Sequence, residues 1–125
     1  MKILVVEDTY IAQKMIESMF VRQGCEVEIA DNGYQGLEKA LESQYDVILM
    51  DIGLGAGPDG FATTANIKAL SELNKTTPIF AVTAHNEEEF KQKAIEYGMD
   101  GYFNKPFTPE NAKAVIDYKN AKKST

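Results

Sequence analysis

The polar residues of this chain that could do chemistry stand at the ends of short apolar runs. Asp51 closes an uninterrupted apolar run at 47–50, which is typical of a strand buried on both faces of a parallel sheet. A carboxylate in this place either opens a turn or lies in a crevice. The crevice is favoured because Glu7 and Asp8 follow the first apolar run of the chain and Lys105 follows the last.

The chemistry open to these groups follows from their charges. If the strands that end at Glu7-Asp8 and at Asp51 are neighbours, two carboxylates about 4 Å apart repel by roughly 4 kcal/mol at an effective dielectric constant near 20. Such a cluster either takes up a proton or binds a cation, and its oxygen ligands suit Mg²⁺. With Lys105 and Thr83 opposite, the site could receive a phosphoryl group on Asp51. Alternatively, Lys105 only neutralises the acids.

The elements that must position these residues alternate between strand and helix five times. Strands are expected at 3–6, 26–30, 47–51, 78–83 and 101–104. Helices are expected at 10–23, from 33, at about 61–73, from about 86 to 98 and from 109, where apolar residues recur at helical spacing. The third helix is the least clear, because Thr63 and Thr64 dilute its apolar face. Four glycines and a proline make the segment 53–60 a loop.

Local signals support the helix ends. Gly24 and Gly98 are natural stops for the first and fourth helices. Asn86 followed by Glu89 has the spacing of a capping box. Pro109 suits the first turn of the last helix.

A strand–helix unit repeated five times predicts an α/β fold, in which helices cover both faces of a parallel sheet through right-handed crossovers. The chain is expected to form one domain over 1–125, with a polar end at about 119–125 that frays. In such open sheets the site lies beyond the carboxyl ends of the strands. The residues expected to face inward from the second and fourth helices are Leu37, Ala40, Leu41, Phe90, Ala94 and Tyr97.

Composition excludes several classes of function. The 125 residues include 13 basic and 19 acidic side chains, and the resulting net charge of -6 argues against nucleic-acid binding by this domain. No apolar run approaches the length that spans a membrane, so no membrane contact by the domain is expected. The single cysteine, Cys25, has no partner for an internal disulfide, which fits a cytoplasmic setting.

Taken together, the motifs resemble the receiver domains of two-component signalling, over essentially the whole chain. They are Val6-Glu7-Asp8, Val47-Ile48-Leu49-Met50-Asp51, Val82-Thr83-Ala84-His85, Gly98-Met99-Asp100-Gly101-Tyr102 and Lys105-Pro106-Phe107. The resemblance implies a flavodoxin-like, doubly wound sheet of five strands in the order 2-1-3-4-5. It also implies a phosphorelay domain that takes a phosphoryl group from a phosphohistidine partner, either a histidine kinase or a histidine phosphotransfer domain.

The resemblance further implies a role for each matching residue. Asp51 is the phosphoacceptor, and Mg²⁺ is held by Glu7, Asp8, Asp51 and the Gly53 carbonyl. The residues that bind the phosphoryl group are Thr83, the Ala84 amide and Lys105. Thr83 and Tyr102 form a switch, in which the ring moves inward as the threonine approaches the phosphate. The signal then leaves through the face made by helix 86–98, strand 101–104 and the last helix, where a downstream protein could bind. The isolated domain is not an enzyme, although it catalyses its own phosphorylation and dephosphorylation.

Finer details favour one branch of the family. The segment from Val6 through Gln13-Lys14 and the motif ending at His85 resemble receivers of hybrid sensor histidine kinases, so the chain could belong to the cytoplasmic part of a membrane-anchored kinase. A stand-alone receiver, or one from a DNA-binding regulator, is the alternative. His85 is expected to be an ordinary loop residue. The loop 53–60 is longer than usual, with its proline displaced to Pro58, which leaves its effect on the phosphorylated state open.

Other classes are less well supported. A Mg²⁺-dependent phosphohydrolase also uses an aspartyl nucleophile, but Gly53 stands where its general acid would be, two residues after Asp51. A flavodoxin-like cofactor binder needs a phosphate-cradling loop after the first strand, and Glu7-Asp8 would repel a phosphate there. A pseudo-receiver is disfavoured because none of the active-site positions is replaced.

Overall fold

The computed structural model describes residues 1–85 and 87–123. The strands are β1 (Lys2–Val6), β2 (Glu26–Ala30), β3 (Val47–Asp51), β4 (Ile79–Thr83) and β5 (Gly101–Asn104). The helices are α1 (Tyr10–Val21), α2 (Gly33–Glu42), α3 (Gly60–Leu70), α4 (Glu88–Glu96) and α5 (Pro109–Lys123).

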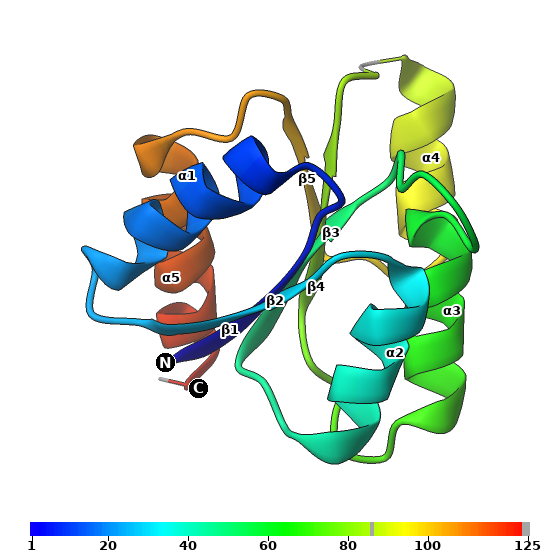
Figure 1. Ribbon diagram of the computed structural model, residues 1–125, viewed down its shortest axis with the longest axis horizontal. Helices are drawn as coiled ribbons and strands as arrows, with labels where there is room; N and C mark the ends of the chain where they lie inside the picture. The colour runs from blue at the N-terminus through cyan, green and yellow to red at the C-terminus, as the bar shows by residue number, and fades with distance from the viewer. Residues whose placement is uncertain (86, 124–125) are drawn as a thin grey trace.

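The five strands form one parallel sheet in the order β2-β1-β3-β4-β5. Helices α1 and α5 cover one face of this sheet, and α2, α3 and α4 cover the other (Figure 1). The doubly wound, flavodoxin-like α/β fold predicted from the sequence is therefore confirmed. The strand order reverses between β1 and β3, which places the carboxyl ends of these two strands side by side.

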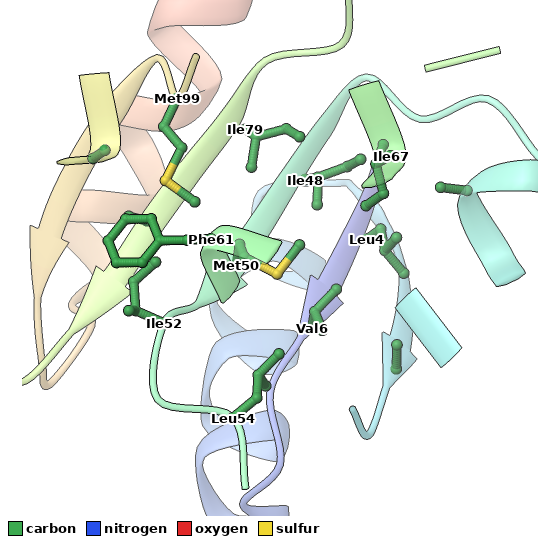
Figure 2. Packing of buried hydrophobic residues seen from close by; sticks show 14 of the residues in the cluster. Leu4, Val6, Ile48, Met50, Ile52, Leu54, Phe61, Ile67, Ile79 and Met99 are labelled. Atoms are coloured by element: carbon green, nitrogen blue, oxygen red, sulfur yellow. The ribbon is translucent and has the colours of Figure 1, made fainter. Parts of the chain in front are cut away.

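The central strands are buried on both faces, which explains why they read as unbroken apolar runs. Ile48 and Met50 of β3 point into the cluster under α2, α3 and α4 shown in Figure 2. Val47 and Leu49 of the same strand pack on the opposite side, under α1 and α5. Because full burial of each such side chain is worth about 1.5 to 3 kcal/mol, the register of β3, and hence the place of Asp51, is firmly set.

Helix α2 approaches the sheet through small residues, which corrects one prediction. Ala40 is buried as expected, but Leu41 is 48% exposed. The buried face of α2 is formed by Gly33, Gly36 and Ala40. A Cβ atom at Gly36 would lie 3.0 Å from Val6 Cγ2, so a larger residue would push against Val6. Glycine thus favours this close approach, and with this face on the sheet Leu41 points outward.

The apolar residues of α1 also divide between core and surface. Ile16 and Phe20 are buried, whereas Ile11 is 70% and Met15 52% exposed. The helix ends at Val21 rather than at Gln23. Gly24 follows with a φ of 83°, a conformation in which side chains with a Cβ are strained.

The two threonines of α3 do not weaken its packing, because both are fully buried. The Thr63 hydroxyl donates to the Asp59 carbonyl oxygen at 2.8 Å. The Thr64 hydroxyl has no hydrogen-bond partner among the described residues. In α4, Ala94 is buried and Phe90 packs on the core as expected, but Tyr97 is 36% exposed. The prediction that it faces inward is thus only partly met, since its ring still contacts Phe61, with centroids 5.3 Å apart.

Buried Asn74 joins the amino-terminal ends of β3 and β4 to helix α2. Its amide nitrogen donates to the carbonyl oxygens of Ala40 and Ser43 at 2.6 and 2.7 Å. Its side-chain oxygen accepts from the Tyr45 backbone N–H at 2.9 Å and the Thr77 hydroxyl at 3.0 Å. All four hydrogen-bonding places of the amide are thereby filled, which makes Asn74 a cross-link inside the fold.

The helix termini follow local rules. Asn32 caps α2 by accepting from the Gln35 N–H at 2.9 Å, and α5 begins at Pro109 as predicted. The polar segment from 119 is helical as far as Lys123. The capping box predicted at Asn86 lies outside the described residues. Across the described part of the chain, every helix is too short or too polar to cross a membrane.

Candidate functional site

An acidic cluster lies at the carboxyl ends of β1 and β3, where the strand order of the sheet reverses. Carboxylate oxygens of Glu7, Asp8 and Asp51 lie within 4.8 Å of one another. The first two residues follow β1 and the third ends β3. Since these strands are paired in parallel with Val6 beside Met50, their ends deliver the acids to the same edge of the sheet. Glu7 and Asp51 are 2% exposed, whereas Asp8 is open to solvent.

Burial and crowding change the protonation of this cluster. The pKa of Glu7 is raised from 4.5 to about 7, first by burial and then by the hydrogen bond and negative charge of Asp51. Lys105 and the N–H of Thr9, which donates to Glu7 Oε1 at 3.2 Å, act in the opposite direction. Near neutral pH, the cluster thus relieves its repulsion partly by holding a proton on Glu7.

Lys105 faces the acids from the end of β5. Its Nζ atom lies 3.1 Å from Asp51 Oδ2 and 3.7 Å from Glu7 Oε2. Burial lowers the pKa of Lys105, but the attraction of Asp51, Glu7 and Asp8 outweighs this effect and raises the pKa above its ordinary value of 10.5. The ammonium group is therefore charged and held against the carboxylate of Asp51.

The two oxygens of Asp51 have different surroundings. Oδ1 accepts a hydrogen bond from the Gly53 N–H at 3.0 Å, which turns the chain directly after β3. Oδ2 is buried and has no hydrogen-bond partner of regular geometry among the described residues, so the nearby ammonium of Lys105 is its main electrostatic contact. Since an oxygen of an ionised carboxylate can accept more than one contact, Oδ2 can take a further cation or a reacting atom beside Lys105.

The end of β4 supplies the expected hydroxyl. Thr83 is buried at the carboxyl end of β4, one residue beyond the pairing of Asp51 with Val82. Its hydroxyl oxygen accepts from the N–H of His85 at 3.0 Å. Ala84 follows in the exposed loop. The structure thus brings Thr83 and Ala84 to the same edge of the sheet as the acids and Lys105.

The side chain of Tyr102 is half-buried. Its ring packs against the buried cluster under α2, α3 and α4. Its hydroxyl is buried without a hydrogen-bond partner among the described residues, and burial raises the pKa of this hydroxyl. The movement expected of Tyr102 during switching stays a prediction.

Gln13 is a residue of the site that sequence reasoning missed. Its buried amide nitrogen donates to the Glu7 carbonyl oxygen at 2.6 Å and to Asp31 Oδ1 at 2.8 Å. It thereby ties the end of β1 to the turn after β2. A signal was present in the sequence: Gln13 stands three and seven residues before Ile16 and Phe20, so it is a polar residue on the buried stripe of α1.

His85 lies beside the site without joining the acids. It stacks on Phe90, with ring centroids 4.3 Å apart. Its Nδ1 atom lies 3.5 Å from Glu87 Oε2. Its surroundings agree with an ordinary loop residue.

An apolar cleft lies next to the acidic cluster and Lys105. The cleft has a volume of about 320 Å³ and opens beside Glu7 and Lys105, between α1 and the β5–α5 loop. Met15 and Pro106 line its sides. Glu7 and Lys105 of the site therefore border a surface with room for part of another molecule.

Comparison with known proteins shows the family. The response regulator receiver domain matches residues 3–117, and the chain belongs to that family. The transcriptional regulatory protein ResD of Bacillus subtilis is 35% identical over 108 residues, which cover 86% of this chain and 43% of ResD. Hybrid signal transduction histidine kinase I of Dictyostelium discoideum is 37% identical over 123 residues, which cover 93% of this chain and 7% of the kinase.

A solved structure shows the same likeness. It is the receiver domain of the sensor histidine kinase PA1611 from Pseudomonas aeruginosa PAO1, with a magnesium ion coordinated in its active site cleft. Its TM-score with this chain is 0.85 at 32% identity, over 95% of this chain and 97% of that one.

The prediction of a two-component receiver domain is thus confirmed. Membership of this family of signalling domains also sets aside the phosphohydrolase and cofactor-binding alternatives. The chain spans less than half the length of the two curated relatives, 43% and 7%. One is a transcriptional regulator and the other a hybrid kinase, at similar identity, so they do not decide between the two predicted origins.

Proposed function

We propose that the domain accepts a phosphoryl group on Asp51 from a phosphohistidine partner, in a reaction that depends on Mg²⁺. The observation that carries this proposal is the buried Asp51 carboxylate, grouped with Glu7 and Asp8 and paired with Lys105 at 3.1 Å. A carboxylate oxygen of Asp51 forms a bond to phosphorus as the bond to the partner's imidazole nitrogen breaks. The product is an acyl phosphate, and the imidazole leaves with the electron pair.

The acids of the site fit Mg²⁺. Three carboxylates within 4.8 Å, one of them with an oxygen that lacks a hydrogen-bond partner among the described residues, form the hard oxygen environment that this ion prefers. Glu7, Asp8 and Asp51 would hold the ion together with the Gly53 carbonyl. When bound, Mg²⁺ neutralises charge on the phosphoryl oxygens during transfer.

The remaining polar residues bind and position the phosphoryl group. Lys105 screens the charge of Asp51 before transfer and pairs with the phosphoryl oxygens afterwards. Thr83 and the N–H of Ala84 donate to the same oxygens, for which the Thr83 hydroxyl must turn toward Asp51. These groups also support the loss of the phosphoryl group to water, so the domain catalyses both halves of its own cycle.

The signal leaves through a shift between two states. Phosphoryl oxygens draw Thr83 toward Asp51, and the space that it leaves holds the ring of Tyr102 in the inward position. The change reaches the face formed by α4, β5 and α5, where a downstream protein binds. A bias of about 2 to 3 kcal/mol between the states would change that partner's affinity by roughly 30- to 150-fold.

The partner that donates the phosphoryl group contacts α1 beside the cleft. Ile11 and Met15 are large apolar side chains that point into solvent, and Met15 also lines the cleft next to Lys105. A helix that carries the phosphohistidine can bury these side chains while its imidazole reaches Asp51. Such a contact would account for the exposure of Ile11 and Met15 on α1.

The chemistry is tested with a small phosphodonor. With Mg²⁺ and acetyl phosphate, the protein should gain one hydroxylamine-sensitive phosphoryl group, measured by intact mass, and Asp51→Asn should not be labelled at that site. Label on Thr83 or His85 of the unmodified protein would show that Asp51 is not the nucleophile. The origin of the domain is tested by the sequence on either side of it: a preceding ATPase domain supports the hybrid kinase, and a following helix-turn-helix supports a DNA-binding regulator.

A further inference from the structure

The long β3–α3 loop (52–59) contacts the rest of the fold near its start and near its end. Near its start, Leu54 is buried in the core beneath α2, α3 and α4 (Figure 2). Near its end, Gly57 lies so close to the ring of Tyr34 that a Cβ atom there would be 2.7 Å from Tyr34 Cε2. Pro58 packs in the same way on Gly33, where α2 begins. The residues between these contacts, Gly55 and Ala56, are thus held at both ends of a short span.

Between these two points, the loop makes a hydrogen bond to Asp8. The N–H of Gly55, between the two contacts, donates to Asp8 Oδ2 at 3.1 Å. Asp8 is exposed, and its other oxygen has only a 3.5 Å contact with the Thr9 hydroxyl, which is too long to hold it. Of the hydrogen bonds that the described residues make to Asp8, the one from Gly55 is thus the only short one. A Cβ atom at Gly55 would lie 3.2 Å from the same oxygen, so the approach is close.

We propose that Gly55 is a positioning residue for the metal site: the loop, held in place by the ring of Tyr34, uses its backbone N–H to orient Asp8. This hydrogen bond, made to one carboxylate oxygen, fixes the direction in which the Asp8 carboxylate points beside Glu7 and Asp51. Hydrogen bonds of this kind fix the direction of a ligand and reduce the entropy that it loses on binding. The inference rests on the proposed function, because it gives the extra loop length a role at the Mg²⁺ site.

The first test needs no metal. In ¹H–¹⁵N spectra of the metal-free protein, the Gly55 amide should exchange with solvent roughly tenfold more slowly than the exposed amides of Ala56 and Gly57, as expected for a hydrogen bond of about 1.4 kcal/mol. Asp8→Ala should remove that protection. Tyr34→Ala should also remove it, because the loop loses its support, whereas Tyr34→Phe keeps the ring and should retain it.

The second test measures Mg²⁺ affinity by calorimetry. Gly55→Pro deletes the N–H and should weaken Mg²⁺ binding roughly tenfold, the lower end of the range for groups that orient a metal ligand. Tyr34→Ala should weaken it in the same direction, and Tyr34→Phe should bind as the unmodified protein does. Tyr34 is 69% exposed, so both of its variants should fold even if Gly55→Pro does not.

The outcomes separate this inference from the proposed function. If the unmodified protein binds Mg²⁺ and Tyr34→Ala binds it as tightly as Tyr34→Phe, the positioning role of the loop is wrong and the metal site stands. Equal exchange rates for the Gly55, Ala56 and Gly57 amides would overturn the inference as well. If the unmodified protein does not bind Mg²⁺ at all, the proposed function fails and the inference fails with it.

Discussion

The raised pKa of Glu7 predicts that protons and Mg²⁺ compete for the site. With a pKa of about 7, Glu7 is about 10% ionised at pH 6 and about 90% ionised at pH 8. If Mg²⁺ binds only the ionised form, its apparent affinity should fall roughly tenfold between pH 8 and pH 6. Each ion bound near pH 6 should also release close to one proton, because the ion replaces it.

The raised pKa of Glu7 also determines how the stability of the metal-free protein depends on pH. The folded pKa lies above the ordinary value of 4.5, so between these values the native state holds more protons than the unfolded state. The stability linked to this proton is fully present below pH 4.5 and is lost as the pH rises through 7. The difference between the folded and unfolded pKa values of Glu7 corresponds to at most about 3 kcal/mol, and screening by solvent reduces it.

Calorimetric Mg²⁺ titrations at pH 6, 7 and 8 measure how the Mg²⁺ affinity depends on pH. Urea unfolding in the presence of a chelator measures how the stability of the metal-free protein depends on pH. Glu7→Gln is the control, because it keeps the shape of the side chain and removes its titration. That variant should bind Mg²⁺ more weakly, with an affinity nearly independent of pH. The reasoning would be refuted if the unmodified protein varied by less than twofold across this range, or if Glu7→Gln showed the same tenfold dependence.

Substitutions at two buried polar residues and at one exposed methionine give three further predictions. Asn74→Ala should cost about 3 kcal/mol in urea unfolding, because it leaves several buried groups without hydrogen bonds; a loss below 1 kcal/mol would contradict its role as a cross-link. Thr64→Val should stabilise the protein by about 1 kcal/mol, since the buried hydroxyl has no partner among the described residues. Met15→Lys should leave labelling by acetyl phosphate unchanged but slow transfer from a phosphohistidine protein roughly tenfold; equal slowing of both would mean that Met15 supports the site itself.

Local patterns predicted most of the fold and the reactive groups. The unbroken apolar run before Asp51 indicated a strand buried on both faces, and the strand is buried on both faces. Pro109 marked the start of the last helix correctly. These signals are reliable because they depend on the conformation of a few neighbouring residues, and because parallel strands must end at the same edge of the sheet.

Tertiary structure decided what depends on residues far apart in sequence. Leu41 faces solvent because Gly36 lets α2 approach Val6 closely, and no pattern within α2 encodes that rotation. The hydrogen bond from Gly55 to Asp8 joins residues 47 positions apart, and its geometry exists only once the loop is packed on Tyr34. The sequence by itself therefore determined which groups could react, whereas the packing of the finished fold decided how they are oriented and protonated.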